Sequence, residues 1–119
     1  MNNFEIGRLG EDAVALYLER MGYRILARNY RSRFGEVDII FQDRGCIVFG
    51  EVKTRSTNYF GEPQEAVNYK KQRRIIATAK TYIANKNITG VNLRFDVFEV
   101  YYNTKKIKHI ENAYFVYRM

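Results

Sequence analysis

Four charged residues lie inside two apolar segments of the chain, and their types suit the chemistry of phosphodiester hydrolysis: Glu36, Asp38, Glu51 and Lys53. The two segments, residues 35–41 and 46–54, flank a short polar stretch that is typical of a hairpin turn. A two-residue loop at Arg44-Gly45 predicts that Asp38 lies opposite Glu51. The same register places Glu36 opposite Lys53, so that all four side chains share one face.

Two opposed carboxylates, with Cβ atoms roughly 5 Å apart, repel each other and favour a bound cation. We expect a hard divalent ion, Mg²⁺ or Mn²⁺, held by Asp38 and Glu51. Lys53 beside it would help to stabilise the charge that develops on a phosphoryl oxygen. The alternative is a solvated ladder of ion pairs at the end of a hairpin. The strongly apolar neighbours favour the first interpretation, because charges in such strands are costly without a purpose.

The overall charge also favours an acidic polymer as partner. The 119 residues include 20 Lys and Arg against 13 Asp and Glu, which gives a net charge of +7. A basic run on a predicted helix, assisted by arginines from loops, is expected to contact phosphates, although a solvated helix face is the alternative. These nucleic-acid-binding candidates are Lys70, Lys71, Arg73, Arg74, Arg31, Arg33 and Arg55.

The elements that must position these residues follow from periodicity. Apolar residues recur at helical spacing over residues 4–21, residues 23–31 are rich in strand formers and suit a sheet edge, and the hairpin strands are apolar enough for the middle of a sheet. Pro63 predicts a second helix from about Gln64 to Asn85, which buries Val67, and residues 93–102 and 106–119 predict two closing strands. We therefore expect an α/β or α+β domain, residues 1–119, with helices flanking a mixed sheet.

Composition excludes several protein classes. One cysteine and one histidine can form neither an internal disulfide nor a four-ligand zinc site. The chain has no secretory signal pattern and no apolar run of membrane-spanning length, so we expect a cytoplasmic protein without a membrane partner. His109 has no nucleophile context and is expected to be structural.

The order Asp38 followed by Glu51-Val52-Lys53 resembles the D…ExK signature of the restriction-endonuclease-like superfamily. Five more specific sequence motifs resemble the YraN-like family of predicted nucleases, and the resemblance spans nearly the whole chain. The motifs are residues 35–38 (GEVD), 51–55 (EVKTR), 60–63 (FGEP), 65–67 (EAV) and 94–97 (RFDV). Gly50 departs from the larger apolar residue that the family more often carries, and is expected to add flexibility to its strand.

The resemblance implies the α-β-β-β-α-β core shared with archaeal Holliday junction resolvases. It also implies a metal-dependent endonuclease that acts on DNA, including branched or damaged DNA, with Glu11 of the first helix at the metal site and a homodimer as the assembly. Because one fold hosts several functions, a non-catalytic nucleic-acid-binding protein remains the alternative. RNA instead of DNA also stays open. Tyr59 and Phe60 are expected either to stack on an unpaired base or to cover the core, and Asp96 has no assigned role.

Overall fold

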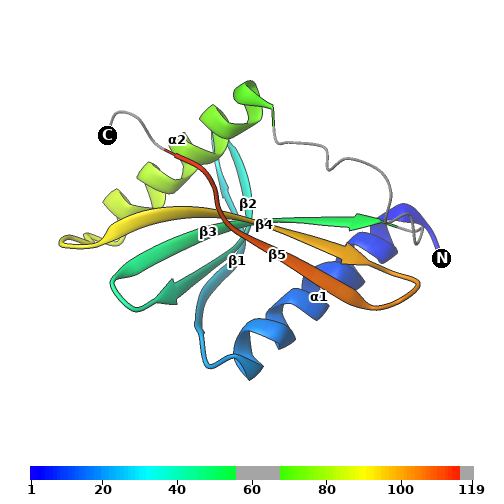
Figure 1. Cartoon of the computed structure of the whole chain (residues 1–119). Coiled ribbons are helices and arrows are strands. Elements are labelled where there is room, and N and C mark those ends of the chain that lie inside the picture. Colours follow the sequence, from blue (N-terminus) through cyan, green and yellow to red (C-terminus); the bar gives the residue numbers. More distant parts are fainter. Residues whose placement is uncertain (56–67, 116–119) are drawn as a thin grey trace.

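The computed structural model describes residues 1–55 and 68–115. Its elements follow the predicted order of one helix, three strands, one helix and two strands (Figure 1). They are α1 (Asn3–Arg20), β1 (Arg24–Ser32), β2 (Gly35–Asp43), β3 (Cys46–Arg55), α2 (Tyr69–Asn85), β4 (Asn92–Tyr101) and β5 (Lys106–Tyr114). The α+β fold class and the α-β-β-β-α-β order are thereby confirmed.

The five strands form one mixed sheet in the order β1-β2-β3-β4-β5. β3 and β4 pair in parallel and all other neighbours are antiparallel, because α2 crosses over between β3 and β4. β1 lies at an edge of the sheet, as predicted, and β3 lies at its centre. The two apolar hairpin segments thus form the inner strands β2 and β3. Glu36 and Asp38 lie in the first half of β2, and Glu51 and Lys53 lie in the second half of β3.

The two helices cover opposite faces of the sheet (Figure 1). On one face, Val14 and Leu18 of α1 pack with Phe41, Val48 and Phe98. On the other face α2 packs on alternate residues of the same strands, because successive strand side chains point to opposite sides. Its contacts are made by Ile75, Ala79 and Tyr82, with Ile40, Phe49 and Phe95 from the sheet. Neither helix of the described residues is long and apolar enough to cross a membrane.

α2 begins later than the predicted start at Gln64. Asn68 has an extended backbone, and its side-chain oxygen accepts a hydrogen bond of 2.9 Å from the N–H of Lys71, so it caps the helix at Tyr69. A helix that continues through Asn68 is therefore a wrong prediction, because the asparagine cap begins α2 at Tyr69, where apolar spacing alone would extend it toward the N-terminus; Gln64 lies outside the described residues. Tyr59, Phe60, Pro63 and Val67 lie outside the described residues.

Both outer strands of the sheet are irregular. In β1 the register shifts between Ile25 and Ala27, and Asn29 has a φ of 51°. In β5 Asn112 has a φ of 55°, beside a register shift in its pairing with β4. These register shifts interrupt the regular ladder of both outer strands.

Candidate functional site

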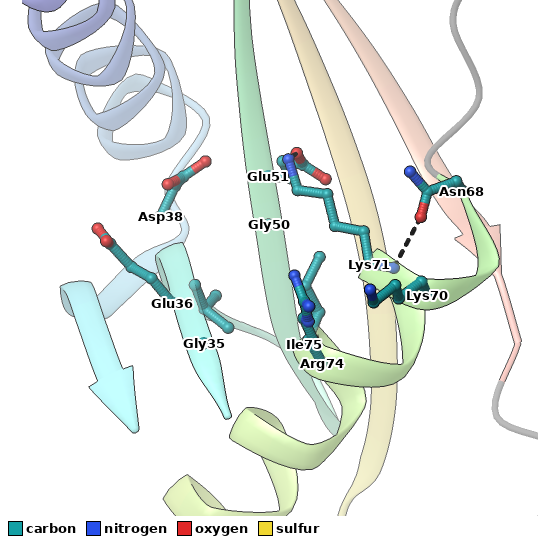
Figure 2. A pocket seen from close by; sticks show the side chains of 11 residues that line it. Gly35, Glu36, Asp38, Gly50, Glu51, Asn68, Lys70, Lys71, Arg74 and Ile75 are labelled. Atoms are coloured by element: carbon teal, nitrogen blue, oxygen red, sulfur yellow. Dashed lines mark hydrogen bonds and ion pairs between the residues drawn. The ribbon is translucent and has the colours of Figure 1, made fainter. Parts of the chain in front are cut away.

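Acidic and basic side chains meet in a cavity of about 540 Å³ between the sheet and the first turns of α2 (Figure 2). The carboxylates come from β2 and β3, and the cations come from α2. The charged residues that line the cavity are Glu36, Asp38, Glu51, Lys70, Lys71 and Arg74. The structure thus brings together three of the four predicted catalytic residues and three of the predicted phosphate contacts.

Asp38 lies where the β2–β3 ladder ends. The predicted register is correct from Asp43–Cys46 as far as Ile39–Gly50. Within these two strands the expected pairing of Asp38 with Glu51 is absent from the ladder, and so is that of Glu36 with Lys53. Instead the Asp38 carboxylate accepts a hydrogen bond of 2.8 Å from the N–H of Val52. The prediction of directly opposed pairs was wrong because the Asp38 side chain, and not a backbone carbonyl of β2, accepts the hydrogen bond from Val52.

Asp38 is surrounded by other acidic groups. Its pKa is raised to about 7: burial is the largest cause, the charges of Glu11, Glu51 and Glu36 add to the rise, and the hydrogen bond from Val52 opposes it. These carboxylates reach the site from α1, β3 and β2. An ionised Asp38 is therefore unfavourable unless a cation is bound beside it.

Glu11 reaches this group from α1 through Asn29. The Asn29 amide nitrogen lies 3.0 Å from an oxygen of Glu11 and 3.1 Å from an oxygen of Glu36. Arg31, a predicted phosphate contact, forms an ion pair of 3.3 Å with Glu36. Gly10, which precedes Glu11, packs directly on β3: a Cβ there would overlap the hydroxyl of Thr54. Its missing side chain therefore lets α1 bring Glu11 close to the sheet.

Glu51 is the most buried carboxylate of the cavity, with a side chain 8% exposed. One of its oxygens forms an ion pair with Lys71, which extends from α2 toward it (Figure 2). The other oxygen, Oε2, is buried and has no hydrogen-bond partner among the described residues. The neighbouring Gly50 is required by packing, since a Cβ would lie 2.8 Å from the Phe98 ring and 2.9 Å from Ile39.

Lys53 is the predicted catalytic residue that does not line this cavity. β3 continues in parallel register with β4, which sets Lys53 opposite Glu99. Of the described residues around the cavity, those of β3 that line it are Gly50 and Glu51. Arg55, a predicted phosphate contact, forms an ion pair of 3.1 Å with the buried Glu99. The sequence signal for Glu99 was a charge within an apolar strand, but its partners could not be read from spacing.

The donor set fits a divalent cation that keeps part of its water shell. In residues 1–55 and 68–115, no three Asp, Glu, His or Cys side chains are close enough to hold a metal ion together. Mg²⁺ commonly binds through one or two carboxylates plus substrate phosphates, and keeps several waters. Asp38 and Glu51 would supply those carboxylates, and the unpartnered Oε2 of Glu51 is a suitable ligand atom.

The basic residues of α2 make its N-terminus strongly electropositive. The first turn contains no acidic residue, although the helix dipole favours negative charge there, and it carries Lys70 and Lys71. Arg74 follows on the same side and lines the cavity. Arg73 lies in an adjoining groove together with Arg33, which comes from the turn after β1. An anionic group in the cavity would offset this accumulation of positive charge.

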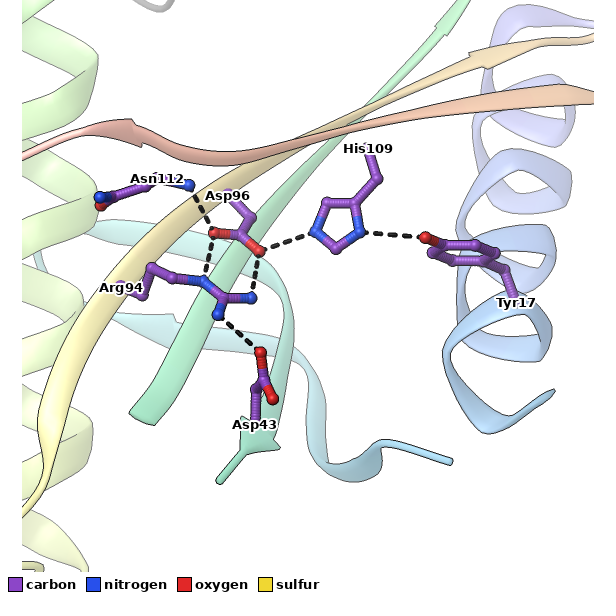
Figure 3. A network of polar contacts seen from close by, with 6 residues as sticks. All are labelled: Tyr17, Asp43, Arg94, Asp96, His109 and Asn112. Carbon is purple, nitrogen blue, oxygen red and sulfur yellow. Dashed lines mark hydrogen bonds and ion pairs between the residues drawn. The ribbon is translucent and has the colours of Figure 1, made fainter. Parts of the chain in front are cut away.

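A second polar cluster lies on the α1 face of the sheet and links α1 to β2, β4 and β5: Tyr17, Asp43, Arg94, Asp96, His109 and Asn112 (Figure 3). Asp96 is fully buried and accepts hydrogen bonds from Arg94 at 2.9 Å and from His109 at 2.7 Å. Burial favours a higher pKa for Asp96, but the hydrogen bonds from His109, Arg94 and the N–H of Asn112 lower it overall. The cluster therefore joins the elements of the fold, which assigns Asp96 a structural position that sequence alone did not reveal.

Known sequences resemble this chain over nearly its full length. Residues 10–100 match the sequence model of the uncharacterised protein family UPF0102. A UPF0102 protein of Alkaliphilus oremlandii is 51% identical over 116 residues, covering 94% of this chain and 99% of the relative. Similar proteins of Clostridioides difficile and Persephonella marina are each 46% identical; the alignments cover 96% of this chain and 100% of the first relative, and 91% of both chains for the second.

Proposed function

This chain belongs to the uncharacterised protein family UPF0102, and we propose that it is a nuclease that cleaves phosphodiester bonds of DNA with a divalent cation, Mg²⁺ or Mn²⁺. Membership agrees with the YraN-like resemblance of its sequence motifs. The observation that carries the proposal is the cavity in which Asp38 and Glu51 face the cations of α2. Such a cavity has ligands for a metal ion on one wall and ligands for phosphate on the other.

Each wall of the cavity has a separate task in this proposal. Lys70 and Arg74 bind the phosphate backbone and orient it toward β2 and β3. Asp38 and Glu51 hold the cation, which when bound would stabilise negative charge on a phosphoryl oxygen. In the metal-free protein, the ion pair with Lys71 compensates the negative charge of Glu51.

The resemblance to the restriction-endonuclease-like superfamily supports the same proposal. The order Asp38, Glu51, Lys53 matches the signature of that superfamily, and the element order is the one that the resemblance implies. Lys53 is two residues beyond Glu51 on the same face of β3. Its contribution to hydrolysis remains a prediction for mutagenesis, and so do the homodimer and the cytoplasmic location.

The test is cleavage of supercoiled plasmid DNA and of a synthetic four-way junction in Mg²⁺, Mn²⁺ or EDTA. We expect metal-dependent cutting by the natural protein and its loss in Asp38→Asn, Glu51→Gln and Lys53→Ala. Lys80→Ala is the matched control, because Lys80 is an exposed lysine of α2 that lines a different cavity. Equal cutting by the control and the site variants would indicate a contaminating nuclease and contradict the proposal.

Binding without catalysis is the second candidate function, favoured by the net charge of +7. It predicts DNA binding in EDTA whose affinity falls steeply with salt, together with no cutting in either metal. Competition between DNA and RNA of one sequence then decides which polymer is preferred.

A further inference from the structure

We propose that the groove beside the carboxylate cavity binds unpaired nucleotides, so that the substrate is a nucleic acid with a single-stranded segment next to the cleaved bond. The position of the single-stranded segment next to a cleaved bond rests on the proposed nuclease function. The groove measures about 570 Å³ and lies between the turn after β1 and the first half of α2. Its charged and aromatic residues are Arg33, Phe34, Tyr69, Lys70, Arg73 and Arg74.

Two aromatic rings in this groove are open to solvent. Phe34 is 41% exposed and Tyr69 is 70% exposed. Single exposed aromatic residues are common, but here two occur in one groove with four cations, and no acidic residue lines it in the described part of the chain. Rings for base faces and cations for phosphates together form the usual platform for single-stranded nucleic acid.

Each ring already has a guanidinium group over it. Arg33 lies 4.8 Å from the centre of the Phe34 ring, and Arg73 lies 5.8 Å from the centre of the Tyr69 ring. These contacts hold the arginines beside the rings with N–H groups available for phosphate oxygens. A base can stack on a ring while the neighbouring arginine binds the phosphate of the same strand.

The turn that carries Phe34 is fixed against α2. The N–H of Phe34 donates to the Ser32 hydroxyl at 3.0 Å, and that hydroxyl lies 2.8 Å from the hydroxyl of Thr78 in α2. A Cβ on Gly35 would lie 3.5 Å from the Cβ of Arg74, which shows how closely the turn approaches the helix. The two rings are therefore held on neighbouring, connected elements, and binding needs little ordering of this turn.

Continuity with the carboxylate cavity determines the substrate class. Lys70 and Arg74 line both hollows, so a strand that enters the groove continues toward Asp38 and Glu51. In a regular duplex the base faces are stacked on one another and cannot meet a protein ring. Phe34 and Tyr69 thus favour a flap, a gap or a splayed end over a continuous duplex.

The test measures binding by fluorescence anisotropy in EDTA, so that cleavage cannot interfere. The probes are a single strand, a duplex with a single-stranded flap and a fully paired duplex of the same sequence. We expect Phe34→Leu and Tyr69→Leu each to weaken binding of the first two probes about tenfold, and to change duplex binding less than about twofold. Quenching of a 2-aminopurine base in the flap should be lost in the same variants, since leucine offers no aromatic face.

The matched control is Phe4→Leu. Phe4 is 71% exposed on α1 and has Arg8 at 6.0 Å from its ring, but it lies outside the groove. Equal losses on paired and unpaired probes, equal losses in the control, or no loss on any probe would overturn the inference. An oligoribonucleotide probe should show the same losses, because stacking does not depend on the sugar.

The two proposals fail in distinguishable ways. Aromatic-dependent binding of unpaired probes without metal-dependent cutting would support the groove and contradict the nuclease. Metal-dependent cutting that is lost in Asp38→Asn, with unchanged binding by Phe34→Leu and Tyr69→Leu, would support the nuclease and overturn the groove.

Discussion

Replacing Asp38 with asparagine should change how the stability of the metal-free protein depends on pH. Burial and the charges of Glu11, Glu51 and Glu36 raise the pKa of Asp38 from 3.8 to about 7, against the hydrogen bond from Val52. Between these two values the folded protein holds a proton that the unfolded chain has released. The free energy of unfolding of the natural protein therefore falls as pH rises through this window, by about 1.4 kcal/mol per pH unit. Over the whole window, the raised pKa of Asp38 lowers the free energy of unfolding by about 4 kcal/mol.

Asparagine retains a side-chain oxygen for the Val52 N–H but has no proton to lose. Urea unfolding from pH 4 to pH 8 in EDTA, followed by circular dichroism, should show the variant gaining about 4 kcal/mol relative to the natural protein. Glu19→Gln, at an exposed position of α1, controls for the removal of a surface carboxylate. A difference between the Asp38 variant and the natural protein that stays constant over this pH range would refute the reasoning. If a divalent cation binds at Asp38, adding Mg²⁺ should stabilise the natural protein at pH 8 and leave the variant unchanged.

Three further substitutions test other contacts. Lys71→Ala should lower the free energy of unfolding by about 1–2 kcal/mol in urea titrations, because it leaves the buried Glu51 without its cation; an unchanged midpoint would contradict the ion pair. Gly50→Ala should cost about 1–3 kcal/mol through overpacking, seen as a lower melting temperature, and equal melting would show that the neighbouring side chains can move aside. Asp96→Asn should cost about 1.5–3 kcal/mol at neutral pH, because Arg94 loses one of its two carboxylate partners and keeps only Asp43. Since the pKa of Asp96 is lowered in the fold, this cost should shrink as pH falls below its ordinary value of 3.8, and a cost independent of pH would argue against that account.

The helices, strands and hairpin register could be predicted because they depend on local periodicity and on the Arg44-Gly45 loop. Prediction failed where a side chain competes with the backbone. Asn68 caps α2 and sets its start, and the Asp38 carboxylate takes the Val52 N–H and ends the ladder. The role of Lys71 was also beyond the sequence, because its ion pair with Glu51 forms only when α2 packs across the sheet. Acidic candidates were therefore easier to identify than the cations that compensate them.

The irregular outer strands of the sheet affect how copies of this protein can associate. A regular, exposed strand edge offers unpaired N–H and C=O groups to another chain and promotes aggregation. Here the pairing of β1 shifts register between Ile25 and Ala27, and the pairing of β5 with β4 is irregular beside Asn112. They also expose charged side chains: Arg24, Arg28 and Arg31 in β1, and Lys106 and Lys108 in β5. Edge-to-edge pairing of two copies into one continuous sheet, and the growth of fibrils from it, is thus disfavoured.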